Sequence, residues 1–158
     1  MKPAAAAPAT RRITLLAWCD PWLVALPVST VRRIVAGEAM RTVAGAIGDG
    51  AWLGTVDPGD GRLPAWDLGR LLGLGGGGDA WVLIDRPLPA ALRVGRCLQV
   101  VDLGRTVIRP LPGPAGGPPG TSCFRAEGLA PGLHPAPEFG LLLTPDALLA
   151  DMALEAAS

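Results

Sequence analysis

The residue types that most often carry out catalysis or bind metals are few in this chain and lie far apart. Cysteine occurs only as Cys19, Cys97 and Cys123, and the single histidine is His134. A structural metal site needs about three or four ligands, usually with some of them in short pairs such as Cys-x-x-Cys, and this sequence has no such pair. We therefore expect three ordinary thiols, no metal and no other cofactor.

The histidine and the acidic residues also lack the context of catalytic groups. His134 lies in the proline-flanked segment GLHPAPE, and no serine occurs in a Gly-x-Ser-x-Gly turn. A catalytic base is held by a partner beside its nucleophile, so this pattern favours an exposed loop histidine. The acidic pairs Asp57/Asp60 and Glu127/Glu138 fall in turns or loops, where an aspartate before a proline is typical. The sequence therefore predicts no catalytic residues and no enzyme.

The charge balance and the hydropathy pattern exclude several classes of protein. The 14 basic residues balance 14 acidic residues, and nothing concentrates them into a patch for nucleic acid. No apolar run approaches the roughly 18 residues that cross a bilayer, and the start MKPAAAAPATRR is interrupted by prolines, unlike a signal peptide. We expect a cytoplasmic protein that neither binds nucleic acid nor inserts into a membrane. Its hydrophobic content, 49%, is enough for a sizeable core.

The first core segment, residues 13–37, predicts a β-hairpin followed by a short helix. Its first half consists of two largely apolar runs on either side of an Asp-Pro turn, and in the first run Ile13, Leu15 and Ala17 alternate with Thr14 and Leu16. Its second half, PVSTVRRIVAG, offers Ser29 or Thr30 as a helix N-cap and would display Val31 and Ile34 on one helical face.

A similar arrangement recurs in GRLPAWDLGRLLGL, residues 61–74. A strand pairs across the DPGDG turn with the residues before it, and Asp67 then caps one helical turn. The glycine run at 75–78 lacks the lysine and the hydroxyl residue of a phosphate-binding loop, and it precedes a strand rather than a helix. We interpret it as a linker between two halves of similar size.

The second half of the chain predicts further short strands and one closing helix. The strands are expected at 80–85, at 90–101 with a bend near Gly95, at 106–111 and at 138–145, and the helix at 146–157. Short strands with glycine-rich turns and no crossover helices are typical of an all-β barrel or sandwich.

The order of these elements resembles the CheW family, the adaptor proteins of bacterial chemosensory arrays. WLVALPVSTVRRIVAG (22–37) is similar to the opening of that family, and GRLPAWDLGRLLGL to its most specific signature. ALRVGRCLQV (91–100) and FGLLLTPDALL (139–149) are similar to two later segments. The resemblance covers about residues 13 to 150, each segment being a weak match by itself.

The resemblance implies a single CheW-like domain over 13–150, between an N-terminal tail (1–12) and the end of a C-terminal helix with its tail (151–158). Two small five-stranded β-barrels, at about 13–74 and about 79–150, would share a hydrophobic core. It also implies a non-catalytic adaptor that couples a chemoreceptor to a CheA-type histidine kinase.

A partner-binding surface is expected on the first hairpin, its helix and the hairpin around 56–62. The expected contact residues are Val28, Val31, Ile34, Val56 and Arg62. Core packing is an equal alternative for Val31 and Ile34, because helical spacing chiefly signals burial.

Several departures from the family pattern leave the partners open. Gly59-Asp60 stands where the family usually has Arg-Gly, so an arginine associated with partner contact is absent, and Gly95 and Thr144 replace aspartates. A CheW-like structural or oligomerising module with a different partner is the alternative function, and self-association is left open. A small-molecule hydrolase or transferase would need convergent polar groups, and the sequence shows none.

Overall fold

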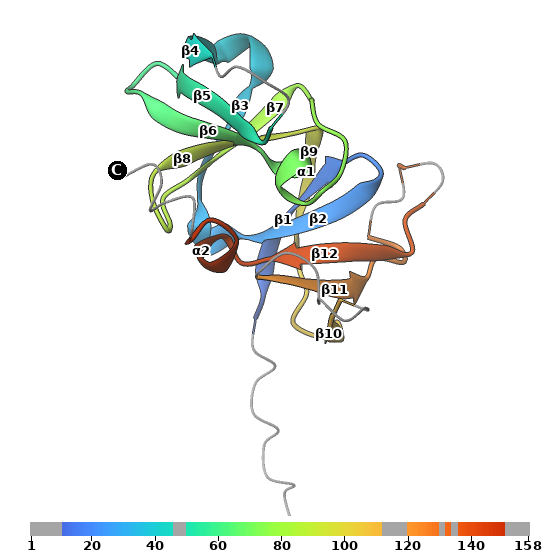
Figure 1. The fold of residues 1–158 in the computed structure, drawn as a ribbon. Coiled ribbons are helices and arrows are strands. Elements are labelled where there is room, and N and C mark those ends of the chain that lie inside the picture. Colours follow the sequence, from blue (N-terminus) through green and yellow to red (C-terminus); the bar gives the residue numbers. More distant parts are fainter. Residues whose placement is uncertain (1–10, 46–49, 112–119, 130–131, 134–135, 151–158) are drawn as a thin grey trace, which may run out of the picture.

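The protein is an all-β molecule built from two six-stranded sheets (Figure 1). The computed structural model describes residues 11–45, 50–111, 120–129, 132–133 and 136–150. Sheet A has the strand order β10-β11-β12-β2-β1-β9, where the strands are β1 (Ile13–Cys19), β2 (Trp22–Pro27), β9 (Arg96–Asp102), β10 (Ile108–Pro110), β11 (Thr121–Arg125) and β12 (Phe139–Leu143). Sheet B has the order β3-β7-β8-β6-β5-β4, where the strands are β3 (Val31–Ala36), β4 (Arg41–Gly45), β5 (Trp52–Asp57), β6 (Leu63–Asp67), β7 (Ala80–Ile84) and β8 (Ala90–Val94).

Short helical turns connect some of these strands. They are the 3-10 turns η1 (Val28–Thr30) and η2 (Gly37–Ala39) and the α-helical turns α1 (Leu68–Leu71) and α2 (Pro145–Leu148). The start of the expected C-terminal helix is therefore present as α2, and its continuation at 151–157 lies outside the described residues.

The two sheets do not follow the expected boundary between residues 74 and 79. Strands β1 and β2 belong to sheet A, where β1 pairs with β9 and β2 pairs in parallel with β12. Strands β7 and β8 belong to sheet B, where β7 pairs with β3 and β8 pairs in parallel with β6. Each half of the chain thus contributes to both sheets, and each sheet has six strands where five were expected. Non-local pairing decides this division, and the composition of the linker does not reveal it.

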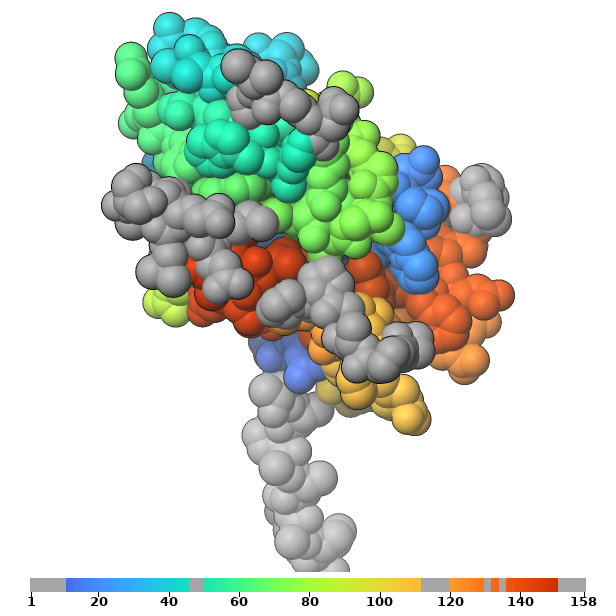
Figure 2. Space-filling view, in the orientation of Figure 1, coloured from blue at the N-terminus to red at the C-terminus, as the bar shows by residue number. Residues whose placement is uncertain are grey.

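Three buried clusters hold the sheets together. The largest, here called the central core, contains residues of β1, β2, β6, β7, β8, β12, α1 and α2, so it lies between the sheets. Two smaller clusters lie on the other faces, one around Phe124 in sheet A and one around Trp81 in sheet B. The space-filling view shows the two sheets in direct contact along this junction (Figure 2). The expectation of a shared hydrophobic core is confirmed.

The expected helix after Pro27 is wrong. Only η1 is helical there, and residues 31–36 form strand β3, which pairs antiparallel with β7. Three of its six residues are β-branched, and such side chains favour a strand when a partner strand is available. A register shift between Val31 and Arg33 disrupts the strict alternation, so residues three apart can face the same side, as in a helix.

Several local predictions are confirmed. The hairpin of β1 and β2, the pairing of Val56 with Leu63 and the break between β8 and β9 at Gly95 all occur as expected. Asp67 caps α1, because its Oδ1 accepts a hydrogen bond from the Arg70 backbone N–H at 3.0 Å.

Candidate partner-binding surface

The cysteines do not form a reactive or metal-binding site. Cys19 is buried at the end of β1, and burial raises the pKa of its thiol to about 12, against the opposite effect of a backbone hydrogen bond with Gly95. Burial also raises the pKa of the Cys97 thiol, so both remain protonated and weakly nucleophilic near neutral pH. All three cysteines are free, and no group of three potential metal ligands occurs among the described residues. His134 lies outside the described part of the chain.

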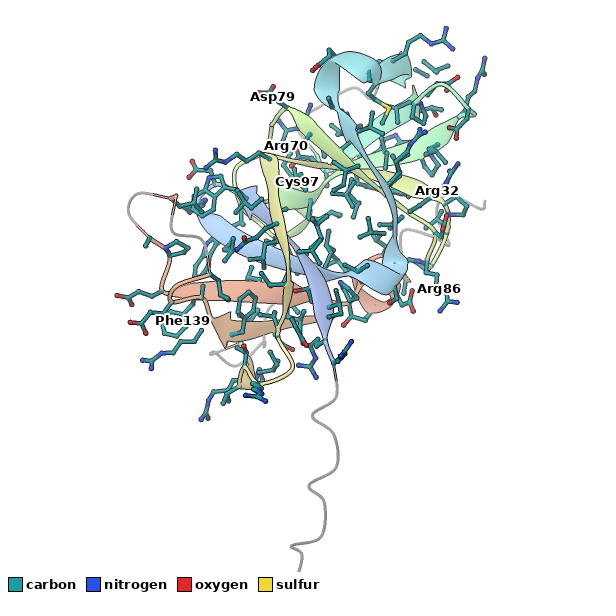
Figure 3. All side chains as sticks on the ribbon, turned by 180° about the vertical axis from the view of Figure 1, so that it is seen from behind. Arg32, Arg70, Asp79, Arg86, Cys97 and Phe139 are labelled. Carbon is teal, nitrogen blue, oxygen red and sulfur yellow. The ribbon has the colours of Figure 1, made fainter. Side chains whose placement is uncertain are left out.

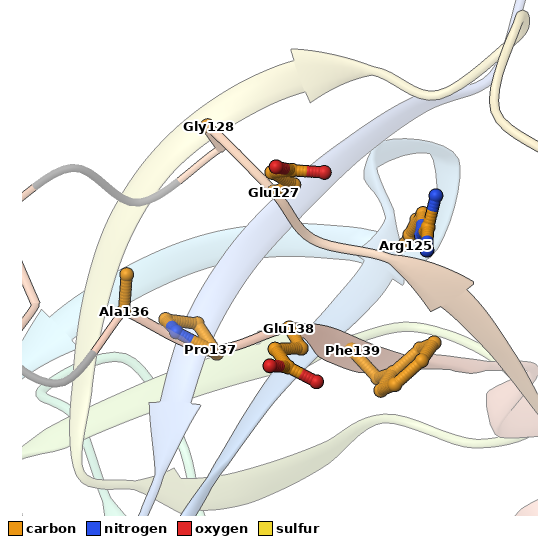
Figure 4. Close-up of a pocket in the computed structure, with 7 residues that line it drawn as sticks. All are labelled: Arg125, Glu127, Gly128, Ala136, Pro137, Glu138 and Phe139. Carbon is orange, nitrogen blue, oxygen red and sulfur yellow. The ribbon is translucent and has the colours of Figure 1, made fainter.

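The two glutamates of the pair Glu127/Glu138 meet at one pocket, at the ends of β11 and β12 (Figure 4). Its volume is about 370 Å³, and Arg125 and Phe139 also line it. Both carboxylates are exposed to solvent, and the described lining residues include no serine, cysteine or histidine. Acid–base catalysis depends on carboxylates that burial or a close charge has tuned, and these side chains lack that environment.

A buried ion pair organises the end of β6 and the start of α1. Asp67 is completely buried, and its Oδ2 accepts hydrogen bonds from Arg93 Nε at 3.0 Å and Nη2 at 2.8 Å. The same oxygen accepts a hydrogen bond from the Gly77 backbone N–H at 2.8 Å. With the cap to Arg70, this carboxylate joins β6, β8, α1 and the glycine run, which we call the Asp67 junction. All its hydrogen bonds are internal, so it is a structural element rather than a binding site.

The glycine run at 75–78 is a packed segment rather than a linker. A side chain on Gly69 would collide with the carbonyl oxygen of Gly75, and one on Gly78 would collide with the carbonyl oxygen of Val94. Gly78 also has a φ of 133°, a conformation that favours glycine. The run therefore lets the backbone approach α1 and β8 closely.

Three of the predicted contact residues, Val28, Val31 and Ile34, lie together at the border of the central core. Paired residues of an antiparallel sheet point to the same face. Val31 pairs with Ile84 and Ile34 pairs with Val82, and both partners belong to the central core. Val28, in η1, also packs against this core.

Two further apolar residues continue this surface on sheet A. Val100 of β9 pairs with Leu15, a central-core residue, and Ile13 lies two positions before Leu15 on the same face of β1. Val28 follows Pro27, the partner of Thr14, so η1 adjoins the start of β1. Together, Ile13, Val28, Val31, Ile34 and Val100 form what we call the apolar rim. The side of the molecule that carries β9 and β3 is seen in Figure 3.

The rim is exposed although its residues are apolar. Ile34 is 47% exposed, Ile13 is 40% exposed and Val100 is 58% exposed. Val28 and Val31 are half-buried beneath them. The sequence did not single out Ile13 or Val100, because alternation assigns a residue to a face but not to the covered or uncovered part of that face.

The other two predicted contact residues are placed differently. Val56 is 1% exposed and belongs to the core on the other face of sheet B, so it cannot contact a partner in this conformation. Arg62 is exposed in the connection between β5 and β6. That connection lies against β3, because Asp60 forms ion pairs with Arg32 at 2.8 Å and with Arg33 at 3.5 Å. Arg62 thus lies near β3, and Val56 supports its hairpin from inside.

Comparison with known proteins identifies the fold. No protein-family model matches the chain, and no curated protein matches it in sequence. The solved structure of the scaffolding protein TtCheW from Thermoanaerobacter tengcongensis is similar to it, with a TM-score of 0.64 over 85% of this chain and 89% of that chain. The fold is CheW-like. Sequence identity is 13%, so the likeness establishes the architecture, and it confirms the resemblance seen in the order of the segments.

The CheW-like fold places the apolar rim where sheets A and B meet. No helix among the described residues is long and apolar enough to cross a membrane. The apolar rim, which includes residues of both sheets, is the surface feature that we consider for partner binding.

Proposed function

We propose that this protein is a non-catalytic, cytoplasmic scaffold of a bacterial chemosensory system that couples a chemoreceptor to a CheA-type histidine kinase. The observation that carries the proposal is the apolar rim on a CheW-like fold. The described residues offer no arrangement of catalytic groups that would favour an enzyme instead, and a solved structure that shares this fold is a scaffolding protein.

The rim has the properties of a protein-binding surface. Three of its side chains keep a large part of their apolar area in water, which is costly unless a partner covers them. Covering a side chain of this type fully contributes about 1.5 to 3 kcal/mol. The two half-buried valines beneath connect the exposed residues to the core, so the rim is a firm surface rather than a set of separate side chains.

Arg62 supplies the polar part of the proposed surface. It is exposed beside the ion-paired turn that holds the β5–β6 hairpin against β3. Charged groups at the edge of an apolar patch set orientation and association rate more than affinity. We therefore propose that the rim supplies most of the binding free energy and that Arg62 helps select the partner.

The test is a calorimetric titration with two partners from the same organism, the regulatory domain of a CheA-type kinase and the cytoplasmic tip of a chemoreceptor. We expect binding of both by the wild-type protein, and a loss of at least about tenfold in affinity for one of them with Ile34→Asp, because a carboxylate would be buried without a partner. Phe139→Asp is the matched control, since Phe139 is 46% exposed but lies on β12, away from the rim (Figure 3).

Circular dichroism must show that both variants are folded. If the folded wild-type protein bound neither partner, the coupling function would be wrong, and a CheW-like module with a different partner would take its place. If Phe139→Asp weakened binding as much as Ile34→Asp, the rim would not be the binding surface.

A further inference from the structure

A second surface with exposed arginines lies on sheet A, at β10 and β11. Arg109 of β10 pairs with Cys123 of β11. Two positions further along β11, on the same face, Arg125 pairs with Phe139 of β12. Leu141, the β12 partner of Cys123, belongs to the central core. The two arginines and Phe139 therefore lie on the core-facing side of sheet A, and their exposure shows that sheet B does not cover this part of it.

This surface contains a cavity of about 380 Å³, lined by Val107, Arg109, Cys123, Phe124, Arg125 and Phe139. Val107 is 64% exposed and Phe139 is 46% exposed. The volume is near the lower end of the range for small-molecule pockets, which is roughly 300 to 1,000 Å³. The cavity thus combines two positive charges, an aromatic ring and an aliphatic side chain on the scale of a small molecule.

The two arginines are diagonal neighbours, and neither is neutralised. Such neighbours in an antiparallel pair have Cα atoms roughly 7 to 8 Å apart, which is within reach of long side chains. Neither Arg109 nor Arg125 has an ion-pair partner among the described residues. Two guanidinium groups at this separation repel each other, and an anion between them would accept hydrogen bonds from both. The arrangement therefore suits a single carboxylate or phosphate group.

Two carboxylates border the cavity and limit the size of its ligand. Glu127 and Glu138 line the adjoining pocket, which shares Arg125 and Phe139 with the cavity (Figure 4). Neither glutamate lines the cavity itself, and neither forms an ion pair with Arg125. Both would repel negative charge that extends beyond the cavity on that side. A compact anion therefore fits this arrangement better than an acidic peptide or a nucleic acid.

We propose that the cavity binds a small aromatic anion, whose carboxylate or phosphate group lies between Arg109 and Arg125 and whose ring lies against Phe139. Guanidinium groups orient such an anion through charge-assisted hydrogen bonds, and the exposed phenyl ring adds a stacking contact. This inference goes beyond the proposed function and does not depend on it, because none of the lining residues belongs to the apolar rim.

The test is a titration of the full-length protein, followed by NMR chemical shifts, with benzoate, phenyl phosphate, inorganic phosphate and benzylamine. We expect benzoate and phenyl phosphate to bind with dissociation constants of about 1 mM or lower, and benzylamine, a cation, at least about tenfold more weakly. Phenyl phosphate should bind at least about threefold more tightly than inorganic phosphate, because its ring contacts Phe139. The tighter of the two aromatic anions identifies whether the head group is a carboxylate or a phosphate.

Three variants locate the effect. Arg109→Gln should weaken the binding of both aromatic anions at least about fivefold, because one guanidinium group remains. Phe139→Ala should weaken phenyl phosphate about threefold and leave inorganic phosphate unchanged. Arg86→Gln is the matched control, since Arg86 is exposed, forms no ion pair among the described residues and lies on the opposite side of the molecule from Phe139 (Figure 3). All three substituted side chains are exposed, and circular dichroism checks that the variants are folded.

Equal affinity for benzoate and benzylamine, or no binding of either aromatic anion at about 10 mM, would overturn the inference. An unchanged affinity in Arg109→Gln would overturn it too, as would an acidic peptide that binds in place of the small anions. If phenyl phosphate bound no more tightly than inorganic phosphate, the site would hold simple ions and the proposal of an aromatic ligand would be wrong. None of these results bears on the titrations with kinase and receptor, and a failure of those titrations would leave this inference standing.

Discussion

The Asp67 junction and the apolar rim differ in which kind of side chain is buried and which is exposed. At the junction, a charged carboxylate is completely buried and every contact that it makes is internal. At the rim, apolar side chains such as Ile34 and Val100 are left in water. The first arrangement fixes the chain at the cost of desolvation, and the second leaves apolar area for a partner. In this molecule the densest group of hydrogen bonds therefore stabilises the fold, and the exposed apolar side chains form the proposed binding site.

The largest effect should come from breaking the junction. Asp67→Ala would leave the Arg93 guanidinium, which is 25% exposed, without its carboxylate and would remove the cap of α1. We expect the free energy of unfolding to fall by about 3 kcal/mol, measured by urea denaturation. Asp60→Ala is the control, because its exposed ion pairs should contribute less than about 1 kcal/mol. Similar losses for both variants would contradict the distinction between the two sites.

A smaller loss of stability is expected from adding a methyl group where the backbone of α1 approaches the glycine run closely. Gly69→Ala would place a methyl group against the Gly75 carbonyl oxygen, and a rigid backbone cannot move away cheaply. We expect a loss of about 1 to 3 kcal/mol in urea denaturation. Gly45→Ala in β4 has open space around the added methyl group and should be nearly neutral. An unchanged stability for Gly69→Ala would show that the glycine run is mobile enough to act as a linker.

A substitution in the rim should weaken partner binding and leave the stability of the protein almost unchanged. Ile34→Ser removes an exposed apolar side chain, so the free energy of unfolding should change by no more than about 0.5 kcal/mol while partner binding weakens. The same denaturation series measures the first quantity, and the titration with kinase and receptor measures the second. A large loss of stability would assign Ile34 to the core, which was the alternative that the sequence left open.

The smallest effect is expected on the stability of the protein at low pH. The backbone N–H groups of Gly59 and Gly61 lower the pKa of Asp57, and those of Arg12 and Gly104 lower that of Asp102, both from an ordinary value of 3.8. A lowered pKa in the folded state means that the stabilisation is present above the ordinary value and is lost as the pH falls through the lowered one. Stability should therefore decline below about pH 4, with a shallower decline for Asp102→Asn. An identical acid limb in the variant would show that these bonds do not stabilise the charged form in solution.

The local signals in the sequence were strong where one turn or one hairpin decides the structure. The cap at Asp67, the hairpin of β1 and β2 and the break at Gly95 depend on neighbours within a few residues, and all three are present. The prediction of a helix after Pro27 was wrong, because the apolar spacing there also fits a strand with a register shift. Only the presence of β7 alongside distinguishes the two, because pairing supplies the backbone hydrogen bonds that a strand needs.

The candidate surface was found in part for the same reason. Val28, Val31 and Ile34 were expected together, but Val56 is in the core, and Ile13 and Val100 were not expected at all. Two residues on the same face of a sheet can differ in burial, because the other sheet covers only part of that face. Val100 and Leu15 pair directly and face the same side, yet Leu15 is buried and Val100 is 58% exposed.

By itself, the sequence determined an all-β chain with its first hairpin, the cap of α1 and a CheW-like order of segments, because these depend on local conformational preferences. The tertiary structure decided which strands share a sheet, that the glycine run packs rather than links, that Arg93 is the partner of Asp67, and which apolar residues remain exposed. Those features arise from contacts between residues far apart in the chain, and the free energy of such contacts depends on which surfaces meet.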